Sequence, residues 1–338
     1  MDLNLIWFIL IGLLFTGYAI LDGFDLGVGA LHLFAKGDKE RRLMINTIGP
    51  VWDGNEVWLV TAGGALFAAF PDVYATLASG FYLAVYLLLF SLIFRAVAIE
   101  FRSKQPMAWW RQTWDVAFCV SSIFSAFLFG VVLGNLIWGV PVGPDKEFHG
   151  SLMGMLHPYA ILVGITVVAL CMMHGSIYVV MKTEGDFHDK VRGWMQNSII
   201  FFVICYFATT MATLLFCTHM ADRIREYPVV FIVPVLKLLA IANVPREIYR
   251  GRDFFAFLSS CFAIGALMFL FGFGLFPNMV LSNPDWFNSL TIYNAASSQK
   301  TLSIMLTIAL IGMPIVLAYT ISIYWIFRGK VKLDEMSY

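Results

Sequence analysis

Residues 5–33 read LIWFILIGLLFTGYAILDGFDLGVGALHL and decide the fold class. A membrane-spanning helix needs about 20 apolar residues, and this stretch is long and apolar enough to supply them. Gly23 and Gly27 form a GxxxG spacing, which permits the close approach of a second helix. Two carboxylates, Asp22 and Asp25, interrupt the apolar run. A carboxylate at membrane depth is costly unless it is paired, protonated or hydrated, so both acids indicate a functional site.

The composition extends the membrane assignment to the whole chain. Of the 338 residues, 60% are hydrophobic and 13% are charged, and the mean hydropathy is +0.79. A soluble protein carries about 25% charged residues. The net charge is zero, which gives no indication of a nucleic-acid partner. The five cysteines lie in apolar runs without a CxxC pair, so we interpret them as core residues rather than disulfides or metal ligands.

Eight further apolar runs follow the first one. We predict an all-α polytopic membrane protein with nine transmembrane helices, at about 5–33, 51–70, 74–99, 113–139, 152–181, 196–219, 228–243, 254–276 and 303–327. Turn residues such as Pro71-Asp72 separate most of these runs. The seventh run is short and contains Lys237, and the polar stretch 277–302 is predicted to be an external loop.

Basic residues alternate between the two sides of this arrangement. Sixteen lysines and arginines fall in loops 35–50, 100–112, 182–195 and 244–253 and in the C-terminal tail, whereas four fall in the opposite loops. Arg95 and Lys237, inside spans, complete the total of 22. Because cytoplasmic loops are enriched in Lys and Arg, we predict an external N-terminus and a cytoplasmic C-terminus.

The predicted orientation brings a second pair of carboxylates to the level of the first. Asp53 and Glu56 lie in the first turns of the second span, and Asp22 and Asp25 lie in the cytoplasmic half of the first. Residues three apart share a helix face, so each pair can point into one groove. Arg95, near the inner end of the third span, can neutralise one acid but not all of them. We therefore predict a proton path formed by Asp25, Asp53, Glu56 and Asp22, with Arg95 as a structural counter-ion.

Other interpretations of the charged residues stay open. Asp53, Glu56 and Asp115 lie in the first turns of predicted helices, where an acid interacts favourably with the helix dipole without any further role. Lys237 is interpreted as snorkelling toward the cytoplasm. The six histidines show no HxxxH or ExxH spacing. A bis-histidine haem would need two histidines at matched depth on facing helices, so no catalytic or metal-ligating group is predicted in this chain.

Four longer motifs carry a family resemblance: LDGFDLGVG (21–29), ERRLMINTIGPVWDGNEVWLVTAGGALFAAFP (40–71), FRAVAIEFRSK (94–104) and NAASSQKTLSIM (294–305). With them, the chain resembles subunit II of bacterial cytochrome bd-type quinol oxidases over nearly its whole length. The resemblance implies two four-helix bundles, 1–139 and 152–276, and a peripheral ninth helix at 303–327. It also implies a multi-pass protein of the bacterial cytoplasmic membrane, the cell inner membrane, that binds no haem of its own.

The resemblance further implies partners and a reaction. Subunit I of such oxidases holds two b-type haems and haem d, and many complexes add a small single-helix subunit. The complex oxidises quinol, reduces dioxygen to water and takes protons from the cytoplasm. Subunit II supports the haem subunit and contributes a proton route, and some members hold a quinone as a structural lipid. The aspartates of the WDGN and GFD motifs, Asp53 and Asp25 here, are the residues that the resemblance assigns to the route.

Two other functions are compatible with acids inside membrane spans. A proton- or cation-coupled secondary transporter would hold them at the midplane beside paired broken helices, whereas these acids lie toward one face. A purely structural scaffold would leave each acid satisfied by a partner. A haem spectrum of the purified complex separates an oxidase from a transporter.

Overall fold

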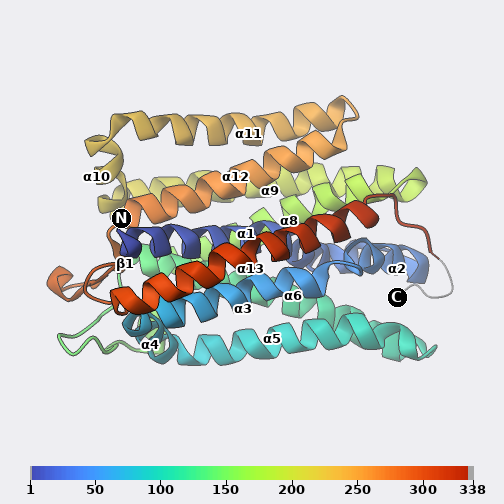
Figure 1. Cartoon of the computed structure of the whole chain (residues 1–338). Helices are drawn as coiled ribbons and strands as arrows, with labels where there is room; N and C mark the ends of the chain where they lie inside the picture. Colours follow the sequence, from blue (N-terminus) through green and yellow to red (C-terminus); the bar gives the residue numbers. More distant parts are fainter. Residues whose placement is uncertain (1, 334–338) are drawn as a thin grey trace.

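Nine long helices run along one axis in the computed structural model, which describes residues 2–333 (Figure 1). They are α1 Leu3–Leu31, α3 Trp52–Ala69, α5 Tyr82–Phe101, α6 Ala108–Trp138, α8 Pro158–Lys182, α9 Gly185–Phe216, α11 Ile232–Tyr249, α12 Asp253–Leu275 and α13 Gln299–Ile326. The first begins and the last ends at opposite ends of the bundle, as an odd number of passes requires (Figure 1). We name the end that carries α2 (Gly37–Ile48) the inner end, because the charge bias predicts it to be cytoplasmic.

Eight of the nine helices are long and apolar enough to cross a membrane by themselves. The exception, α3, qualifies only together with the short helix α4 (Pro71–Gly80), from which it is bent by 120°. The first turns of α3 contain Asp53, Asn55 and Glu56, which lower its apolarity. Within residues 2–333, the nine predicted helices are therefore present, and composition alone supports eight spans, or nine if the bent pair counts as one.

Several helix starts differ from the prediction. The third span was expected at 74–99, but Pro71 begins the separate helix α4, and α5 begins at Tyr82. Proline favours the first position of a helix because it has no N–H to leave unpaired there. The fifth span begins at Pro158 rather than 152 for the same reason, after the single turn α7 (Leu152–Met155). The fourth and sixth spans begin earlier than predicted, because polar turns at their inner ends continue the helix.

Short elements cover both ends of the bundle. At the outer end, the predicted loop 277–302 contains two antiparallel strands, β1 (Asn278–Val280) and β2 (Leu290–Thr291), and the 3₁₀ turn η4 (Trp286–Asn288). The outer end also carries α10 (His219–Glu226) and η3 (Pro228–Phe231). The turns η1 (His32–Phe34) and η2 (Arg102–Lys104) end α1 and α5 at the inner end.

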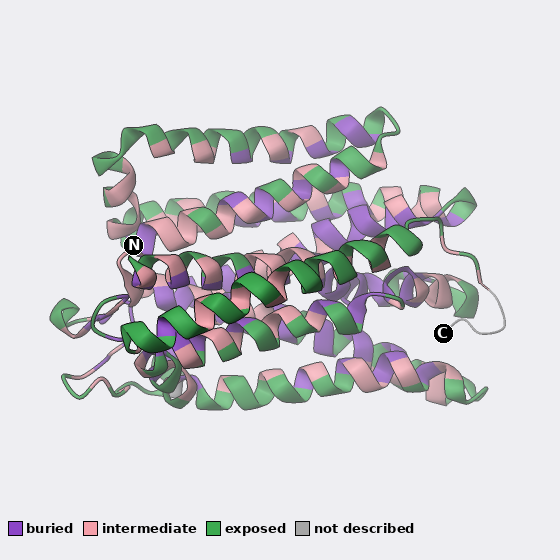
Figure 2. Ribbon diagram, in the orientation of Figure 1, coloured by how far each residue is buried: buried purple, intermediate pink, exposed green. Residues whose placement is uncertain are grey.

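The buried apolar residues form one large group in the central helices and smaller groups elsewhere, and most of α13 lies outside them. The largest group of buried apolar residues joins α1, α6, α8, α9 and α12, whereas α13 is exposed along almost its whole length (Figure 2). A Cβ added to Gly27 would lie 1.8 Å from the carbonyl oxygen of Cys171 and 2.9 Å from the Cα of Gly175. A Cβ added to Gly23 would meet only the His174 ring, at 3.8 Å. The GxxxG spacing therefore acts through Gly27, where α1 and α8 cross in backbone contact.

Candidate functional site

Asp22 and Arg95 form a buried ion pair between α1 and α5. Arg95 Nη1 donates to Asp22 Oδ2 at 2.9 Å, and Nη2 donates to the other carboxylate oxygen. Both side chains are 0% exposed. A guanidinium that bonds both oxygens of one carboxylate makes the strongest kind of protein ion pair. The structure thus pairs the predicted counter-ion Arg95 with Asp22.

Two acids of α3 are more exposed than this pair, and one of them, Glu56, lies beside it. Glu56 Oε1 is 3.4 Å from Arg95 Nη2, and the Glu56 side chain is 23% exposed. Asp53 lies in the first turn of α3 and is exposed at the surface of the chain. The helix dipole can account for Asp53, but Glu56 is one turn further along and faces a cation. Of the two, Glu56 contacts the buried guanidinium, and Asp53 lies one turn before it at the surface of the chain.

Asp25 is fully buried and is bound by an amide instead of a cation. Its Oδ2 accepts a hydrogen bond from Asn55 Nδ2 at 2.7 Å, and its Oδ1 has no hydrogen-bond partner among residues 2–333. Asn55 Oδ1 in turn accepts from the hydroxyl of Tyr324, on α13, at 2.8 Å. One oxygen of the Asp25 carboxyl is therefore held by the protein, and the other is available to gain or lose a proton.

A second polar cluster surrounds Asp115 at the inner end. The Asp115 carboxylate is 1% exposed and contacts His32 Nε2 at 2.6 Å, Arg41 Nη1 at 2.7 Å and Arg102 Nε at 2.5 Å. Because α6 begins at Ala108, Asp115 lies in its third turn, so the helix-dipole interpretation does not apply to it. Sequence reasoning missed the cluster: His32 and Asp115 are 83 positions apart, and only the predicted shared depth of their helices connects them.

Buried polar atoms without a hydrogen-bond partner concentrate in the first four long helices and the turns η1 and η2. Ten such side-chain atoms occur within the described residues, and nine of them belong to residues 18–125. They include Asp25 Oδ1, His32 Nδ1 and the hydroxyls of Ser122 and Ser125, both on α6. By contrast, Ser121 on the same helix donates to its own helix, at Phe118 O. Buried polar groups normally bond to protein or to ordered water, so this interior is suited to hold water.

A family model described as cytochrome bd terminal oxidase subunit II matches residues 3–327. The chain belongs to this family. It is 35% identical to the cytochrome bd-I ubiquinol oxidase subunit 2 of Escherichia coli K12, over 99% of this chain and 96% of that one. It is also 35% identical to the cytochrome bd ubiquinol oxidase subunit 2 of Bacillus subtilis 168, over 99% and 98% of the two chains.

A solved structure shows the same fold. A chain in the structure of bd oxidase from Geobacillus thermodenitrificans matches with a TM-score of 0.80, over 97% of this chain and 98% of that one. The two sequences are 16% identical, so this likeness concerns the fold alone. The family assignment makes the chain a multi-pass bacterial inner-membrane protein and a subunit of a quinol-oxidising complex that contains haem and a subunit I. The predicted family, fold class and location are thereby confirmed.

The buried histidines of this bd oxidase subunit are engaged in other bonds. On α8, His174 Nδ1 is 2.8 Å from the Ser260 hydroxyl, and Nε2 is 2.9 Å from the carbonyl oxygen of Ile20. His32 uses Nε2 for Asp115. Across residues 2–333, no group of three or more His, Cys, Asp or Glu side chains could hold a metal ion. Both buried histidines therefore have protein partners, His174 on both ring nitrogens and His32 on one.

Lys237 lies inside the protein, not at the surface as snorkelling would require. Its side chain is 5% exposed, and Nζ lies 4.6 Å from the centre of the Tyr206 ring on α9. A cation over an aromatic face is stabilised by the ring's electron density. Lys237 therefore connects α11 to α9. It is distant in sequence from every acid of the predicted proton path.

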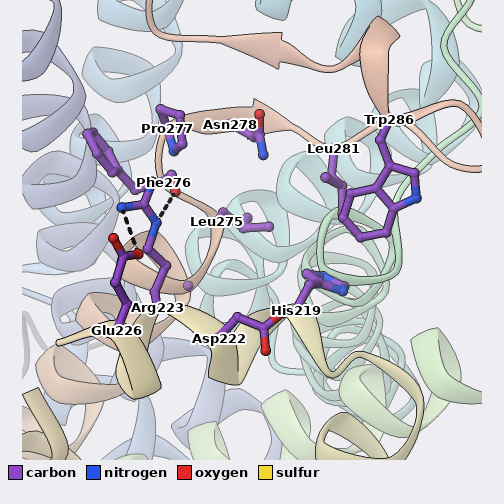
Figure 3. Close-up of a pocket in the computed structure, with 11 residues that line it drawn as sticks. His219, Asp222, Arg223, Glu226, Leu275, Phe276, Pro277, Asn278, Leu281 and Trp286 are labelled. Atoms are coloured by element: carbon purple, nitrogen blue, oxygen red, sulfur yellow. Dashed lines mark hydrogen bonds and ion pairs between the residues drawn. The ribbon is translucent and has the colours of Figure 1, made fainter. Parts of the chain in front are cut away.

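The outer end contains a cavity of about 280 Å³ beside α10 (Figure 3). Its charged lining comes from His219, Asp222, Arg223 and Glu226, and Phe276 and Trp286 face them (Figure 3). Arg223 Nε donates to the Phe276 carbonyl oxygen at 3.0 Å, and its Nη1 is 3.7 Å from Glu226. Asp222 pairs with Arg225, and His219 Nε2 lies 2.9 Å from the Ile137 carbonyl oxygen, so the charged lining has partners in the protein. The cavity lies at the end of the bundle opposite the acids of α1 and α3.

Proposed function

We propose that this subunit supports the haem-bearing subunit I and conducts protons toward it from the cytoplasmic side. The observation that carries the proposal is the Asp25 carboxyl, which is fully buried, has one free oxygen and lies within electrostatic range of Asp22, Arg95 and Glu56. A buried carboxyl with a free oxygen can accept a proton and release it. Acids buried inside membrane spans typically mark proton or ion pathways.

The proposed route enters at Asp53 and continues through Glu56 to Asp25. These acids run from the exposed first turn of α3 to the buried inner half of α1. Asp22, the fourth acid predicted for the path, has both oxygens bonded to Arg95. We assign it to holding the guanidinium, whose charge favours the carboxylate form of a neighbouring relay acid. Ordered water between the unpartnered polar atoms would complete the connection.

The proposed route has an energetic consequence. Protons taken from the inner side and consumed with electrons from quinol, oxidised near the outer side, separate charge across the membrane. Each charge moved is worth about 2.3 kcal/mol per 100 mV of membrane potential. A route restricted to one side is therefore required for the reaction to conserve energy.

We place the contact with subunit I on α3. Its exposed face carries Gly54, Val57, Thr61 and Gly64, at the alternating spacing of three and four that a packed helix face shows. A Cβ added to either glycine would meet no other atom of the described chain within 4 Å. Small residues let helices approach closely in membranes. The exposed Asp53 lies on the same helix, and a carboxylate there is better covered by a polar partner than by lipid.

Replacement of the relay acids tests the proton route. Asp25→Asn and Asp53→Asn should each lower oxygen consumption and proton uptake by about tenfold or more, because a positioned proton donor typically contributes at least that factor. The complex would be assayed in proteoliposomes with its haem content measured. Asp72→Asn, which alters an acid paired with Lys146 at the outer end, serves as the control. Wild-type oxygen consumption and proton uptake in both relay variants would refute the route.

A bulky residue on α3 tests the contact with subunit I. Gly64→Leu should reduce the amount of haem-bearing subunit that co-purifies with this chain. Gly312→Leu on α13 is the matched control, since a Cβ at that position also meets no other atom within 4 Å. Equal recovery of the haem subunit with both variants would contradict the assignment. Identifying the remaining polypeptides and extracted lipids tests the predicted small subunit and bound quinone.

A further inference from the structure

Tyr324 connects the peripheral helix α13 to the acidic core. Within the described chain, α13 buries only Leu302 fully, and most of its side chains are exposed. The Tyr324 hydroxyl nevertheless donates to Asn55 Oδ1 at 2.8 Å, and the other end of that amide contacts Asp25. We propose that Tyr324 is a positioning residue that fixes the Asn55 amide, so that Asp25 exchanges its proton at Oδ1. This inference rests on the proposed proton route.

The hydrogen bonds of Asn55 define one orientation of its amide. Nδ2 donates to Asp25 Oδ2 at 2.7 Å and to the Leu21 carbonyl oxygen at 3.3 Å, while Oδ1 accepts from Tyr324. A backbone carbonyl can only accept, so it opposes a flipped amide that would turn oxygen toward it. In this orientation the Tyr324 hydroxyl donates to Oδ1. Against a flipped amide it would have to accept from Nδ2, and its own proton would lose the acceptor that it has among residues 2–333. Both neighbours therefore favour the same orientation.

The orientation of the amide decides which oxygen of Asp25 carries the proton. An amide nitrogen donates, so Asp25 Oδ2 must accept and cannot hold a proton toward Asn55. The proton is then carried by Oδ1, which has no protein partner among residues 2–333. With a flipped amide, a proton on Oδ2 would bond to the amide oxygen and be retained there. Tyr324 thus keeps the exchangeable proton on the free oxygen.

Contacts at both ends hold α13 in the position that this role requires. At the outer end, Trp7 Nε1 donates to the Leu302 carbonyl oxygen at 2.9 Å. At the inner end, Lys182 Nζ donates to the carbonyl oxygens of Phe327 and Gly329. Phe327 follows Tyr324 by less than one helical turn. The helix is therefore fixed close to the point where its tyrosine enters the core.

The test compares the intact oxidase complex carrying Tyr324→Phe with the same complex carrying Tyr319→Phe. Tyr319 lies on the same helix and is 64% exposed, so it serves as the control. The readouts are the pH dependence of oxygen consumption and the infrared carbonyl band of the protonated Asp25 side chain, identified by its loss in Asp25→Asn. Losing one hydrogen bond should move the midpoint of the pH profile by about 0.5–1 unit. The band should also shift, because a flipped amide moves the Asp25 proton from Oδ1 to Oδ2, where it bonds to the amide oxygen. Haem content should match the control.

The outcomes separate this inference from the proposed route. Full oxygen consumption and proton uptake in Asp25→Asn would refute the route itself. If Asp25→Asn is impaired while Tyr324→Phe matches Tyr319→Phe in pH profile and carbonyl band, the role of Tyr324 alone is refuted. If Tyr324→Phe fails to assemble, 3-fluorotyrosine at position 324 retains the ring and hydroxyl but changes the donor strength. An unshifted Asp25 band in that protein would overturn the proposal.

Discussion

Removing Arg95 should destabilise the subunit severely, because it would leave buried carboxylates without their cation. Arg95 and Asp22 are 0% exposed, and Glu56 Oε1 is 3.4 Å from the same guanidinium. Breaking a buried pair by deleting one partner typically costs about 3–5 kcal/mol. With roughly 2–4 °C of melting temperature per kcal/mol, Arg95→Met should melt about 6–20 °C below the parent.

The double variant Asp22→Asn/Arg95→Met separates a lost ion pair from lost packing. Replacing a whole buried pair with uncharged groups is often neutral, so the double variant should recover most of the stability. Arg225→Met is the control, because it removes a surface ion pair. The Arg225 side chain is 73% exposed, and that of its partner Asp222 is 61% exposed. Such surface pairs contribute about 1 kcal/mol or less. Thermal unfolding of the purified complex gives all four values. Parental stability in Arg95→Met, or a double variant as unstable as the single, would refute the reasoning.

Three further outcomes are expected. Gly27→Ala should destabilise the complex, because the added Cβ would lie 1.8 Å from the Cys171 carbonyl oxygen. Gly12→Ala is the control and should be neutral or stabilising, because a Cβ there meets no atom within 4 Å. Equal melting temperatures of the two variants would contradict this reasoning. Burial raises the pKa of Glu40, but the Lys190 ammonium and the Lys36 N–H outweigh burial and hold that pKa below its ordinary value of 4.5. The ionised Glu40 therefore stabilises the folded subunit above pH 4.5, and this stabilisation is lost as the pH falls through the folded-state pKa. Glu40→Gln should melt below the parent at pH 7, and the difference in melting temperature should disappear in acid. Lys182→Met should release residues 327–333, measured as faster proteolysis there than in the Lys332→Met control.

Local sequence properties account for the parts of the fold that were predicted correctly. Length and apolarity are features of single segments, so residues 5–33 and the later runs could be recognised without knowledge of their neighbours. Helix starts were less predictable, because polar turns can continue a helix beyond the apolar run, as at Ala108. The separate helix α4 was signalled by Pro71, which had been read only as the end of a span.

The candidate site shows where sequence reasoning reaches its limit. Carboxylates at membrane depth are conspicuous, so Asp22, Asp25, Asp53 and Glu56 could be singled out from composition and orientation. Asn55 is uncharged and gave no such signal, although it lies between two of these acids. Tyr324 is 269 positions away from Asn55, and only packing of α13 against α3 brings them together. Residues that meet only through tertiary packing show no periodic pattern in the sequence, so their contact cannot be predicted from it.

The position of Tyr324 near the end of the chain also sets the order in which the site is built during synthesis. Asn55 leaves the ribosome 269 residues before the tyrosine that orients it. At 5–20 residues per second, the amide waits roughly 13–54 s for that partner. The nascent subunit therefore inserts its acids into the membrane with the route unfinished, and the final helix completes it only once translation is nearly over.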